Sequence, residues 1–291
     1  MLPAELFQKV RKIEIKTRRI VDEITGGAYH SVFKGRGIEF DEVREYTDDD
    51  DVRDIDWNVT ARMGVPYIKK YVEERELTVM LLVDASASGA FGSGNVSKRD
   101  QAVESAALLA FSAIRNHDKV GLLIFTDKTE LYLPPRSGRR HVLRLIRELL
   151  AFRPANPGTD IDVALKDMVQ ALKKKAVIFL LSDLINEHSF EKTLKIANKR
   201  HDVIALRLLD PLELRWPRSA ALMLEDAENG NMTFFSGRSS TALERFAIAA
   251  AEYHDGAAAS CRRAKVDMID VRCGEDYVKP LIRFFNRRQG R

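Results

Sequence analysis

The stretch Leu77-Thr-Val-Met-Leu-Leu-Val-Asp84-Ala-Ser86-Ala-Ser88 contains the clearest structural signal in this chain of 291 residues. Its first seven residues are apolar except for Thr78, which is typical of a strand covered on both faces of a sheet. Asp84, Ser86 and Ser88 follow directly, so a carboxylate and two hydroxyl groups stand where the strand ends. Oxygen groups of this kind are the ligands that Mg²⁺ prefers in proteins. The stretch therefore predicts a buried strand that leads into a candidate ion site.

Two more oxygen-bearing side chains follow in other predicted loops. Thr159 lies in Pro157-Gly158-Thr159-Asp160, and Asp183 follows the apolar run at 176–181 and Ser182. Three hydroxyl groups and two carboxylates would leave a divalent ion partly unneutralised if the carboxylates act through water. Such an ion would attract an anionic group from outside the chain. Mg²⁺ is the expected ion, and Mn²⁺ and Ca²⁺ share its preference for oxygen ligands.

The segments from residue 77 onward alternate between strand-like and helix-like patterns, which indicates an α/β domain with a mainly parallel sheet. Strands are expected at 77–83, 120–125, 176–181, 203–209 and 266–271, and helices at 98–116, 140–152, 161–174, 190–199, 241–264 and 277–288. The turn before 129–133 is too tight for a parallel crossover, so that short segment should run antiparallel at an edge and end at Pro134-Pro135. Asn229-Gly230 predicts a hairpin inserted around 220–236.

Residues 1–76 differ from this pattern. Between Glu39 and Asp56 they are rich in carboxylates, including the run from Asp48 to Asp51, yet they carry enough apolar residues to pack. Residues Met1 to Lys16 alternate apolar and charged side chains at helical spacing, whereas extended pieces are expected around 39–56. We therefore expect two parts, an N-terminal segment at 1–76 that packs on the core, and an α/β domain at 77–291.

The motifs also resemble those of known proteins. The pattern Asp84-x-Ser86-x-Ser88 with Thr159 and Asp183 resembles the metal-ion-dependent adhesion site of von Willebrand factor type A domains. Further motifs are similar to those of the bacterial "domain of unknown function 58" family: Gly35-Arg-Gly37-Ile-Glu39-Phe40, Arg44-Glu-Tyr46, Arg53-Asp-Ile55-Asp56-Trp57, Ala61-Arg62, and Phe91-Gly92-Ser93-Gly94 with Lys98. The resemblance covers nearly the whole chain.

The resemblance implies a doubly wound six-stranded sheet with the strand order 3-2-1-4-5-6. In that order the strands ending at Asp84 and Asp183 are neighbours at the point where the winding reverses, where open α/β sheets bind their ligands. Ser86 and Ser88 would coordinate the ion directly, Thr159 directly or through water, and the two carboxylates mainly through water. Three neighbouring residues are expected to support these loops: Asp160 and Ser182 as caps, and Gly89 where relatives often carry Met.

The resemblance also implies a function, a non-enzymatic Mg²⁺-dependent adaptor that binds proteins. An acidic side chain of the partner would complete the coordination of the ion. Relatives are associated with MoxR-type AAA+ ATPases in chaperone-like maturation or stress responses, so such an ATPase is the expected partner.

Two alternatives stay open at this point. A Mg²⁺-dependent phosphohydrolase could use Asp84 as nucleophile, although Ser86 stands where its second carboxylate should be. A carboxylate from residues 39–56 could instead occupy the open metal position of the same chain.

Composition excludes several other classes. The net charge of +4 and the scattered Lys and Arg residues argue against nucleic acid as a partner. No apolar run approaches the roughly 20 residues of a membrane span. Cys261 and Cys273 are too few for a disulfide framework, so a cytoplasmic protein is expected. The Lys98 region lacks the spacing of a phosphate loop, and the serine hydrolase elbow Gly-x-Ser-x-Gly is absent from the sequence.

Overall fold

The computed structural model of this chain describes residues 3–24, 37–47, 50–74, 76–228 and 230–289. They fall into two compact units, one made of residues 1–32 and 77–291 and a smaller one made of residues 33–76. The N-terminal helix α1 (Pro3–Ile24) belongs to the larger unit, not to the smaller unit that follows it in the sequence. Among the described residues, none of the helices is both long and apolar enough to cross a bilayer.

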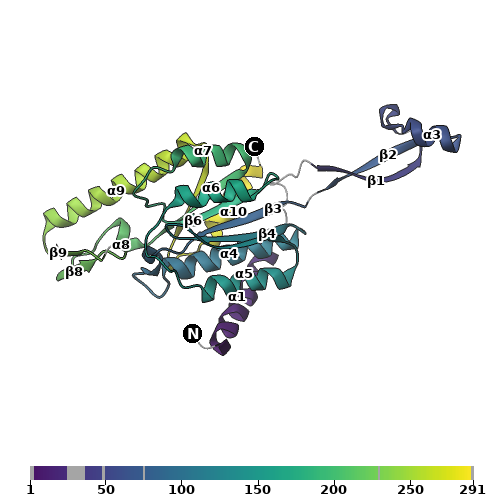
Figure 1. Ribbon diagram of the computed structural model, residues 1–291. Coiled ribbons are helices and arrows are strands. Elements are labelled where there is room, and N and C mark those ends of the chain that lie inside the picture. Colours follow the sequence, from purple (N-terminus) through teal and green to yellow (C-terminus); the bar gives the residue numbers. More distant parts are fainter. Residues whose placement is uncertain (1–2, 25–36, 48–49, 75, 229, 290–291) are drawn as a thin grey trace. The chain divides into compact units, whose positions relative to one another are not determined.

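A six-stranded sheet forms the centre of the larger unit, with its strands in the order β5-β4-β3-β6-β7-β10 (Figure 1). The strands are β3 (Thr78–Asp84), β4 (Lys119–Phe125), β5 (Thr129–Arg136), β6 (Val177–Ser182), β7 (Asp202–Leu209) and β10 (Asp267–Arg272). Neighbouring strands are parallel except β4 and β5, which pair antiparallel. Counted along the chain this is the order 3-2-1-4-5-6, so the predicted fold class and its antiparallel edge strand are confirmed.

The edge strand differs from the prediction in one respect. β5 continues through Pro134 and Pro135 to Arg136, whereas the two prolines were expected to end it. An edge strand tolerates proline because one of its sides donates no hydrogen bonds to a neighbour.

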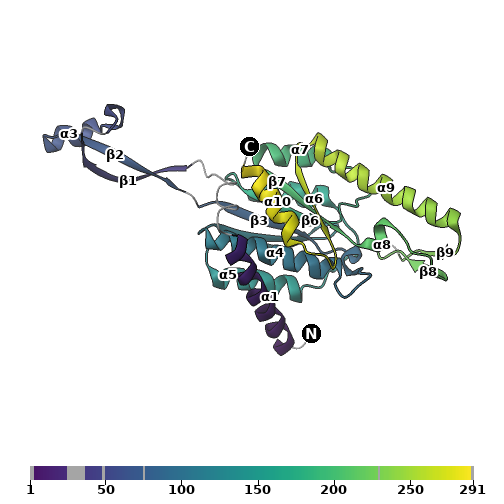
Figure 2. The same cartoon turned by 180° about the vertical axis from the view of Figure 1, so that it is seen from behind.

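Helices cover both faces of the sheet. They are α4 (Lys98–Arg115), α5 (Arg139–Ala151), α6 (Ile161–Ala171), α7 (Glu191–Arg200), α9 (Ser240–Arg263) and α10 (Val278–Gln289). Figures 1 and 2 show α1, α4 and α5 grouped on one face and α6 with α7 on the other. β3 lies in the middle of the sheet, and its residues Val79 to Val83 are at most 3% exposed. Their burial on both faces holds the end of β3, where the candidate site begins, in a fixed position.

The helix α1 agrees with the helical spacing of the N-terminal residues up to Lys16 and continues to Ile24, so the described part of residues 1–76 is not extended throughout. It buries Val10, Thr17 and Val21, whose spacing places them on one face of a helix. That face packs on α4 and α5. Ion pairs flank it, from Lys16 to Glu104 and from Arg139 to Glu14.

The smaller unit is a two-stranded antiparallel sheet of β1 (Gly37–Glu45) and β2 (Tyr67–Glu74), with the short helices η1 (Val52–Asp54) and α3 (Trp57–Met63) between them. Its acidic residues have local roles. Asp50 accepts two hydrogen bonds from Arg44, which lower its pKa to about 2, while Asp51 caps η1 and Asp56 caps α3. Asp48, Asp49, Gly35 and Arg36 lie outside the described residues.

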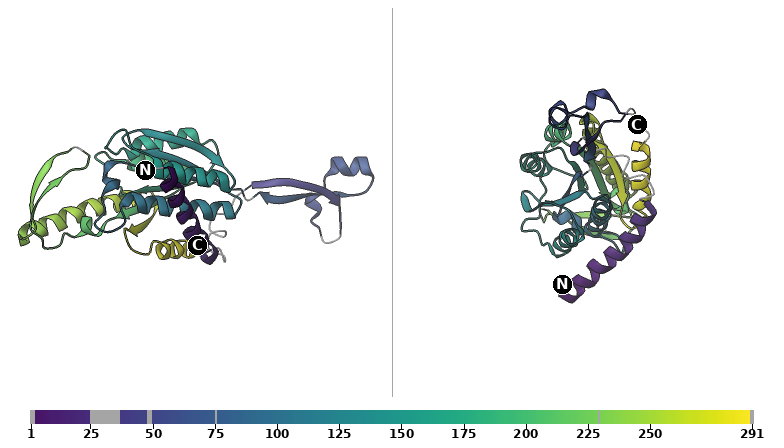
Figure 3. Two further views of the ribbon diagram at one scale, coloured as in Figure 1. Left: turned by 90° about the horizontal axis from the view of Figure 1, so that it is seen from below. Right: turned by 90° about the vertical axis from the view of Figure 1, so that its right-hand side faces the viewer.

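The predicted hairpin is present in the larger unit. β8 (Ala221–Glu225) pairs antiparallel with β9 (Met232–Ser236), and Gly230 has the positive φ of 72° that its turn requires. Asn229 lies outside the described residues. The short helix α8 (Pro211–Leu214) leads toward the hairpin, and Phe235 packs edge-on against Trp216 and against Phe246 of α9. Figure 3 shows the hairpin beside α9 at one end of the sheet.

Candidate metal centre

The ends of β3 and β6 bring the first predicted ligands together. These strands are parallel neighbours with Val83 opposite Leu181, so Asp84 and Ser182 leave the sheet side by side. The Ser182 hydroxyl donates to Asp84 Oδ2 over 2.7 Å. Because the winding of the sheet reverses between β3 and β6, this is the edge where ligand crevices form in α/β proteins.

A chain of hydrogen bonds then joins four of the five predicted ligands. The Ser86 amide donates to Asp84 Oδ1 over 2.9 Å, and the hydroxyl oxygens of Ser86 and Ser88 are 3.1 Å apart. The Ser88 hydroxyl donates to Asp183 Oδ2 over 2.9 Å. These four residues line a cavity of about 10 Å³, together with Gly89, Lys98, Arg99, Ser182 and Leu208. A space of that size is comparable to a single small solvent molecule.

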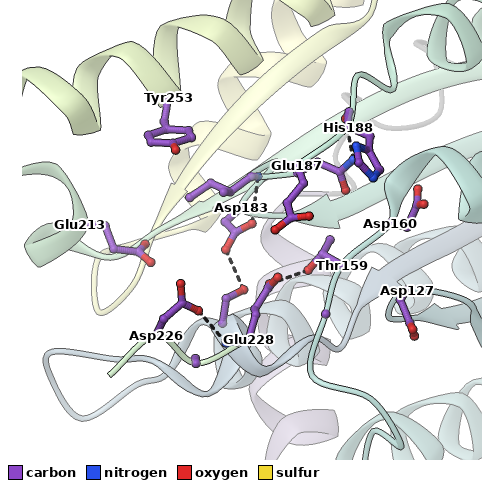
Figure 4. Close-up of a pocket in the computed structure, with 15 residues that line it drawn as sticks. Asp127, Thr159, Asp160, Asp183, Glu187, His188, Glu213, Asp226, Glu228 and Tyr253 are labelled. Atoms are coloured by element: carbon purple, nitrogen blue, oxygen red, sulfur yellow. Dashed lines mark hydrogen bonds between the residues drawn. The ribbon is translucent and has the colours of Figure 1, made fainter. Parts of the chain in front are cut away.

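Thr159 lies in the same region but has a different hydrogen-bond partner. Its loop is tied to the Ser86 loop by a hydrogen bond from the Ala87 amide to the Pro157 carbonyl. With Ser88 and Asp183 it lines a larger cavity of about 540 Å³ (Figure 4). The Thr159 hydroxyl donates to Glu228 Oε1 over 2.8 Å, and Glu228 comes from the turn between β8 and β9. Asp160, the next residue, is the N-cap of α6. Its side chain accepts a hydrogen bond from the Val163 amide.

A buried lysine is the main feature that sequence reasoning missed. The Lys98 ammonium lies 2.7 Å from Asp183 Oδ2 and 2.5 Å from Glu213 Oε1, and the lysine side chain is 2% exposed. Lys98 is the first residue of α4, which Ser97 and Asp100 cap reciprocally. Glu213 is fixed in the same way, since its other carboxylate oxygen accepts from the Asp210 amide in the capping box of α8.

Part of this arrangement has a signal in the sequence. A positive side chain in the first turn of a helix is unfavourable beside the positive end of the helix dipole. Lys98 directly follows the Ser97 cap, which therefore indicates an acidic partner nearby. Asp210-Pro211-x-Glu213 is a capping-box pattern that predicts a helix start close to the end of β7. Glu228 has no such local signal, because its position depends on how the hairpin folds over the sheet.

Burial governs the electrostatics of the site. It raises the pKa of Asp84 to about 6, and the neighbouring charge of Asp183 adds to the effect. Burial also raises the pKa of Glu213 and of Glu228. For Lys98 burial acts in the opposite direction, but the charges of Asp183 and Glu213 outweigh it and raise the pKa of the ammonium. Lys98 is therefore held in its charged form.

The donor groups fit a hard cation in their chemistry. Oxygen atoms alone provide the donors of the predicted set, and the small cavity lies between them. Among the described residues, no group of three or more His, Cys, Asp or Glu side chains is placed to hold a metal ion, so a site here would depend on the hydroxyl groups. The site differs from one made of oxygen ligands alone, because the Lys98 ammonium already pairs a positive charge with Asp183. Ion binding itself stays a prediction.

Comparison with known families now adds to this geometry. Residues 42–256 match the family described as protein of unknown function DUF58. The chain belongs to the DUF58 family. An uncharacterized relative, Rv1480 of Mycobacterium tuberculosis, is 30% identical over 289 residues, which cover 98% of this chain and 91% of the relative. An uncharacterized protein of Mycobacterium avium is 26% identical over 161 residues, which cover 54% of this DUF58 chain and 95% of that protein.

Solved structures show how the fold of this DUF58 protein relates to others. The conserved hypothetical protein BatB from Bacteroides thetaiotaomicron superimposes with a TM-score of 0.50 at 16% identity, covering 74% of this chain and all of that one (100%). The VWA domain of SpRpn10 is another structural neighbour, with a TM-score of 0.40 at 12% identity, covering 71% of this chain and 94% of the domain. The likeness to BatB concerns the fold alone.

Proposed function

We propose that this DUF58 protein is a non-enzymatic adaptor that binds other proteins through a divalent ion, held by Asp84, Ser86, Ser88, Thr159 and Asp183. The observation that carries the proposal is the hydrogen-bond chain from Asp84 to Asp183, which gathers oxygen ligands at the switch point of the sheet. Mg²⁺ is the proposed ion, with Mn²⁺ and Ca²⁺ as alternatives of the same chemistry. When bound, the ion would supply positive charge for an acidic side chain of the partner.

The serines and the carboxylates of the site have different proposed roles. Ser86 and Ser88 present hydroxyl oxygens to the small cavity, while Asp84 and Asp183 hold those serines in place through the Ser86 amide and the Ser88 hydroxyl. An ionised carboxylate has about four acceptor positions, so both can also accept hydrogen bonds from water molecules on the ion. This division supports ligation in which the hydroxyl groups are direct ligands and the carboxylates act mainly through water.

The Thr159–Glu228 hydrogen bond supports an acidic partner. A carboxylate of the same chain already lies beside Thr159 in the lining of the large cavity, so that position accommodates an acidic group (Figure 4). A partner carboxylate that approaches the ion has to displace Glu228 or bind next to it. Glu228 is thus a further candidate, besides a carboxylate from residues 39–56, for an acidic group of this chain at the site.

The partner we propose is a MoxR-type AAA+ ATPase, in chaperone-like maturation or stress responses. This rests on the resemblance of the motifs to families associated with such ATPases. A cytoplasmic location agrees with Cys261 and Cys273, which are both free and buried. Neither nucleic acid nor a membrane enters the proposal.

A pull-down from the extract of the source cell tests the adaptor function. Tagged protein is used with Mg²⁺, with EDTA, and as Ser86→Ala/Ser88→Ala with Mg²⁺. The matched control is Ser105→Ala/Ser112→Ala, which removes two buried serines of α4 that contribute nothing to the site. We expect an AAA+ ATPase with the wild type and the control in Mg²⁺ only. Equal capture in every arm contradicts the proposal.

The contacts of Asp84 favour the adaptor over a phosphohydrolase. Its oxygens accept hydrogen bonds from the Ser86 amide and the Ser182 hydroxyl, and Ser86 stands where a phosphohydrolase needs a second carboxylate for acid–base chemistry. Hydrolysis of a generic phosphate ester that disappears in Asp84→Asn would reverse this choice.

A further inference from the structure

The Lys98 side chain carries a buried positive charge that is paired with two carboxylates. Lysine is almost never fully buried unless it is paired, and Lys98 is 1% exposed. Its partners belong to different elements, Asp183 to the loop after β6 and Glu213 to α8. Lys98 also lines the small cavity that Asp84, Ser86 and Ser88 line, and its ammonium is paired with Asp183 of the same lining. A permanent cation therefore stands beside the position proposed for the divalent ion.

We propose that Lys98 is the specificity-determining residue of this site, because its ammonium lowers the affinity for the divalent ion and raises the affinity of the loaded site for a carboxylate. The inference rests on the proposed function and adds the residue that sets its balance of charge. Asp84, Asp183 and Glu213 supply three negative charges and Lys98 supplies one positive charge. With a divalent ion the group becomes neutral instead of negative, so an incoming carboxylate meets no excess of negative charge.

The hydrogen bonds of Asp183 show how Lys98 acts on the ion. Asp183 Oδ2 accepts from the Ser88 hydroxyl and from Lys98 Nζ, while Oδ1 accepts from the Ile185 amide. Three of about four acceptor positions are therefore taken before an ion or its water arrives. Lys98 competes with the ion both for the lone pairs of Asp183 and through repulsion between like charges at short range.

The position of Lys98 is fixed by its surroundings. The Lys98 amide donates to the Phe91 carbonyl, and the capping box of Ser97 and Asp100 sets the start of α4. On the other side, the capping box of α8 holds Glu213. If the ammonium moved away, it would leave two carboxylates without their cation in a buried place, which is strongly unfavourable. The charge therefore stays at the site when an ion binds.

Titration of Mg²⁺ against thermal unfolding tests this role without any knowledge of the partner. The wild type, Lys98→Met and the control Lys166→Met are unfolded in EDTA and in increasing Mg²⁺. Lys166 also forms an ion pair, at 2.6 Å from Asp162, but its side chain is 59% exposed. In Lys98→Met we expect a lower Tm in EDTA, a larger rise of Tm with Mg²⁺, and an apparent Kd for Mg²⁺ that is at least about tenfold tighter. The control should bind Mg²⁺ as the wild type does.

A second variant keeps the test decisive if Lys98→Met does not fold. Glu213→Gln removes a negative charge from the same group at a side chain that is 21% exposed, and it should weaken Mg²⁺ binding by several-fold. An unchanged or tighter Kd in Glu213→Gln overturns the proposal, as does an unchanged or weaker Kd in a folded Lys98→Met.

The outcomes also separate this inference from the adaptor function. Binding of Mg²⁺ by Lys98→Met but not by the wild type supports the role of Lys98 and contradicts an ion-dependent function of the natural chain. Equal binding by both leaves the adaptor function in place and overturns the role of Lys98. If neither folded protein binds Mg²⁺, both fail.

Discussion

The inner side of the candidate site, made of Asp84, Ser86, Ser88 and Asp183, is held by two central strands, whereas its outer side, Thr159 with Glu228, is held by a loop and a hairpin. The inner residues follow β3 and β6, whose apolar residues are almost completely buried. The outer pair depends on the β8–β9 hairpin, where Met223 and Phe234 are 58% and 66% exposed. The difference teaches that the four proposed inner ligands are positioned by the core of the fold, whereas the position of Glu228 beside Thr159 depends on a weakly packed insertion.

Cavity-forming substitutions should give the largest contrast between the two sides. Leu82→Ala removes a side chain in β3 that is fully buried (0% exposed), and we expect a loss of about 2–5 kcal/mol in the free energy of unfolding. Met223→Ala in the hairpin should change it by less than about 0.5 kcal/mol, because that side chain is exposed. Urea unfolding measures both. Similar losses would show that the hairpin is as firmly packed as the sheet.

Removal of single hydroxyl groups should give a smaller contrast in the same direction. Ser182→Ala leaves Asp84 Oδ2 and the Leu184 amide without a hydrogen bond, at a cost of about 1–3 kcal/mol in the free energy of unfolding. Thr159→Val removes only the bond to Glu228, at a half-buried position, and should cost less than about 1 kcal/mol. The same urea experiment compares them, and a larger loss in Thr159→Val would reverse the ranking of the two sides.

The pH dependence of unfolding in EDTA offers a third comparison. Burial raises the pKa of both Asp84, to about 6, and Glu228, so the folded state binds protons more tightly than the unfolded state does. Each group therefore stabilises the fold below its unfolded pKa, near 4, and this contribution is lost as pH rises through its folded pKa. Relative to Asp84→Asn, the wild type should lose stability from pH 4 to pH 7. Relative to Glu228→Gln the loss should be smaller, and a gain with rising pH would contradict the assignment.

The smallest change in the free energy of unfolding is expected from a substitution of Glu228. Glu228→Gln keeps an acceptor for the Thr159 hydroxyl and should change stability by less than about 0.5 kcal/mol. It removes a negative charge from the lining of the large cavity, so capture of an acidic partner in Mg²⁺ should rise a few-fold. Glu244→Gln, at an exposed position of α9 that does not line this cavity, is the matched control for a mere change of net charge. Reduced capture in Glu228→Gln alone would mean that Glu228 contacts the partner rather than excludes it.

The inner side was predictable from sequence because its residues directly follow buried strands. The apolar runs predicted β3 and β6, and the tight turn at Thr126-Asp127-Lys128 predicted the antiparallel edge strand. The order of the strands came from the family resemblance, and it agrees with the structure. Once that order is known, the meeting of Asp84 with Asp183 needs no further information.

Other features could not be predicted in this way because they depend on contacts between distant segments. Lys98 and Glu213 are 115 positions apart, and their ion pair needs α4 and α8 to start side by side. Glu228 reaches Thr159 only because the turn of the hairpin lies beside the Thr159 loop, 69 positions away in the sequence. Helical spacing indicated the start of α1, up to Lys16, but its packing on α4 and α5 joins segments that are far apart in the sequence.

The two buried cysteines have a practical consequence for experiments that follow movement of the β8–β9 hairpin. Burial raises the pKa of Cys261 and of Cys273 to about 11, so near neutral pH both thiols are protonated as well as enclosed. Thiolate is the form that reacts with maleimide or iodoacetamide labels, so the natural chain should label very slowly while it is folded. The variant Met223→Cys, at an exposed position, would therefore accept a fluorescent or spin probe selectively, and movement of the hairpin could be followed in solution with both native cysteines kept.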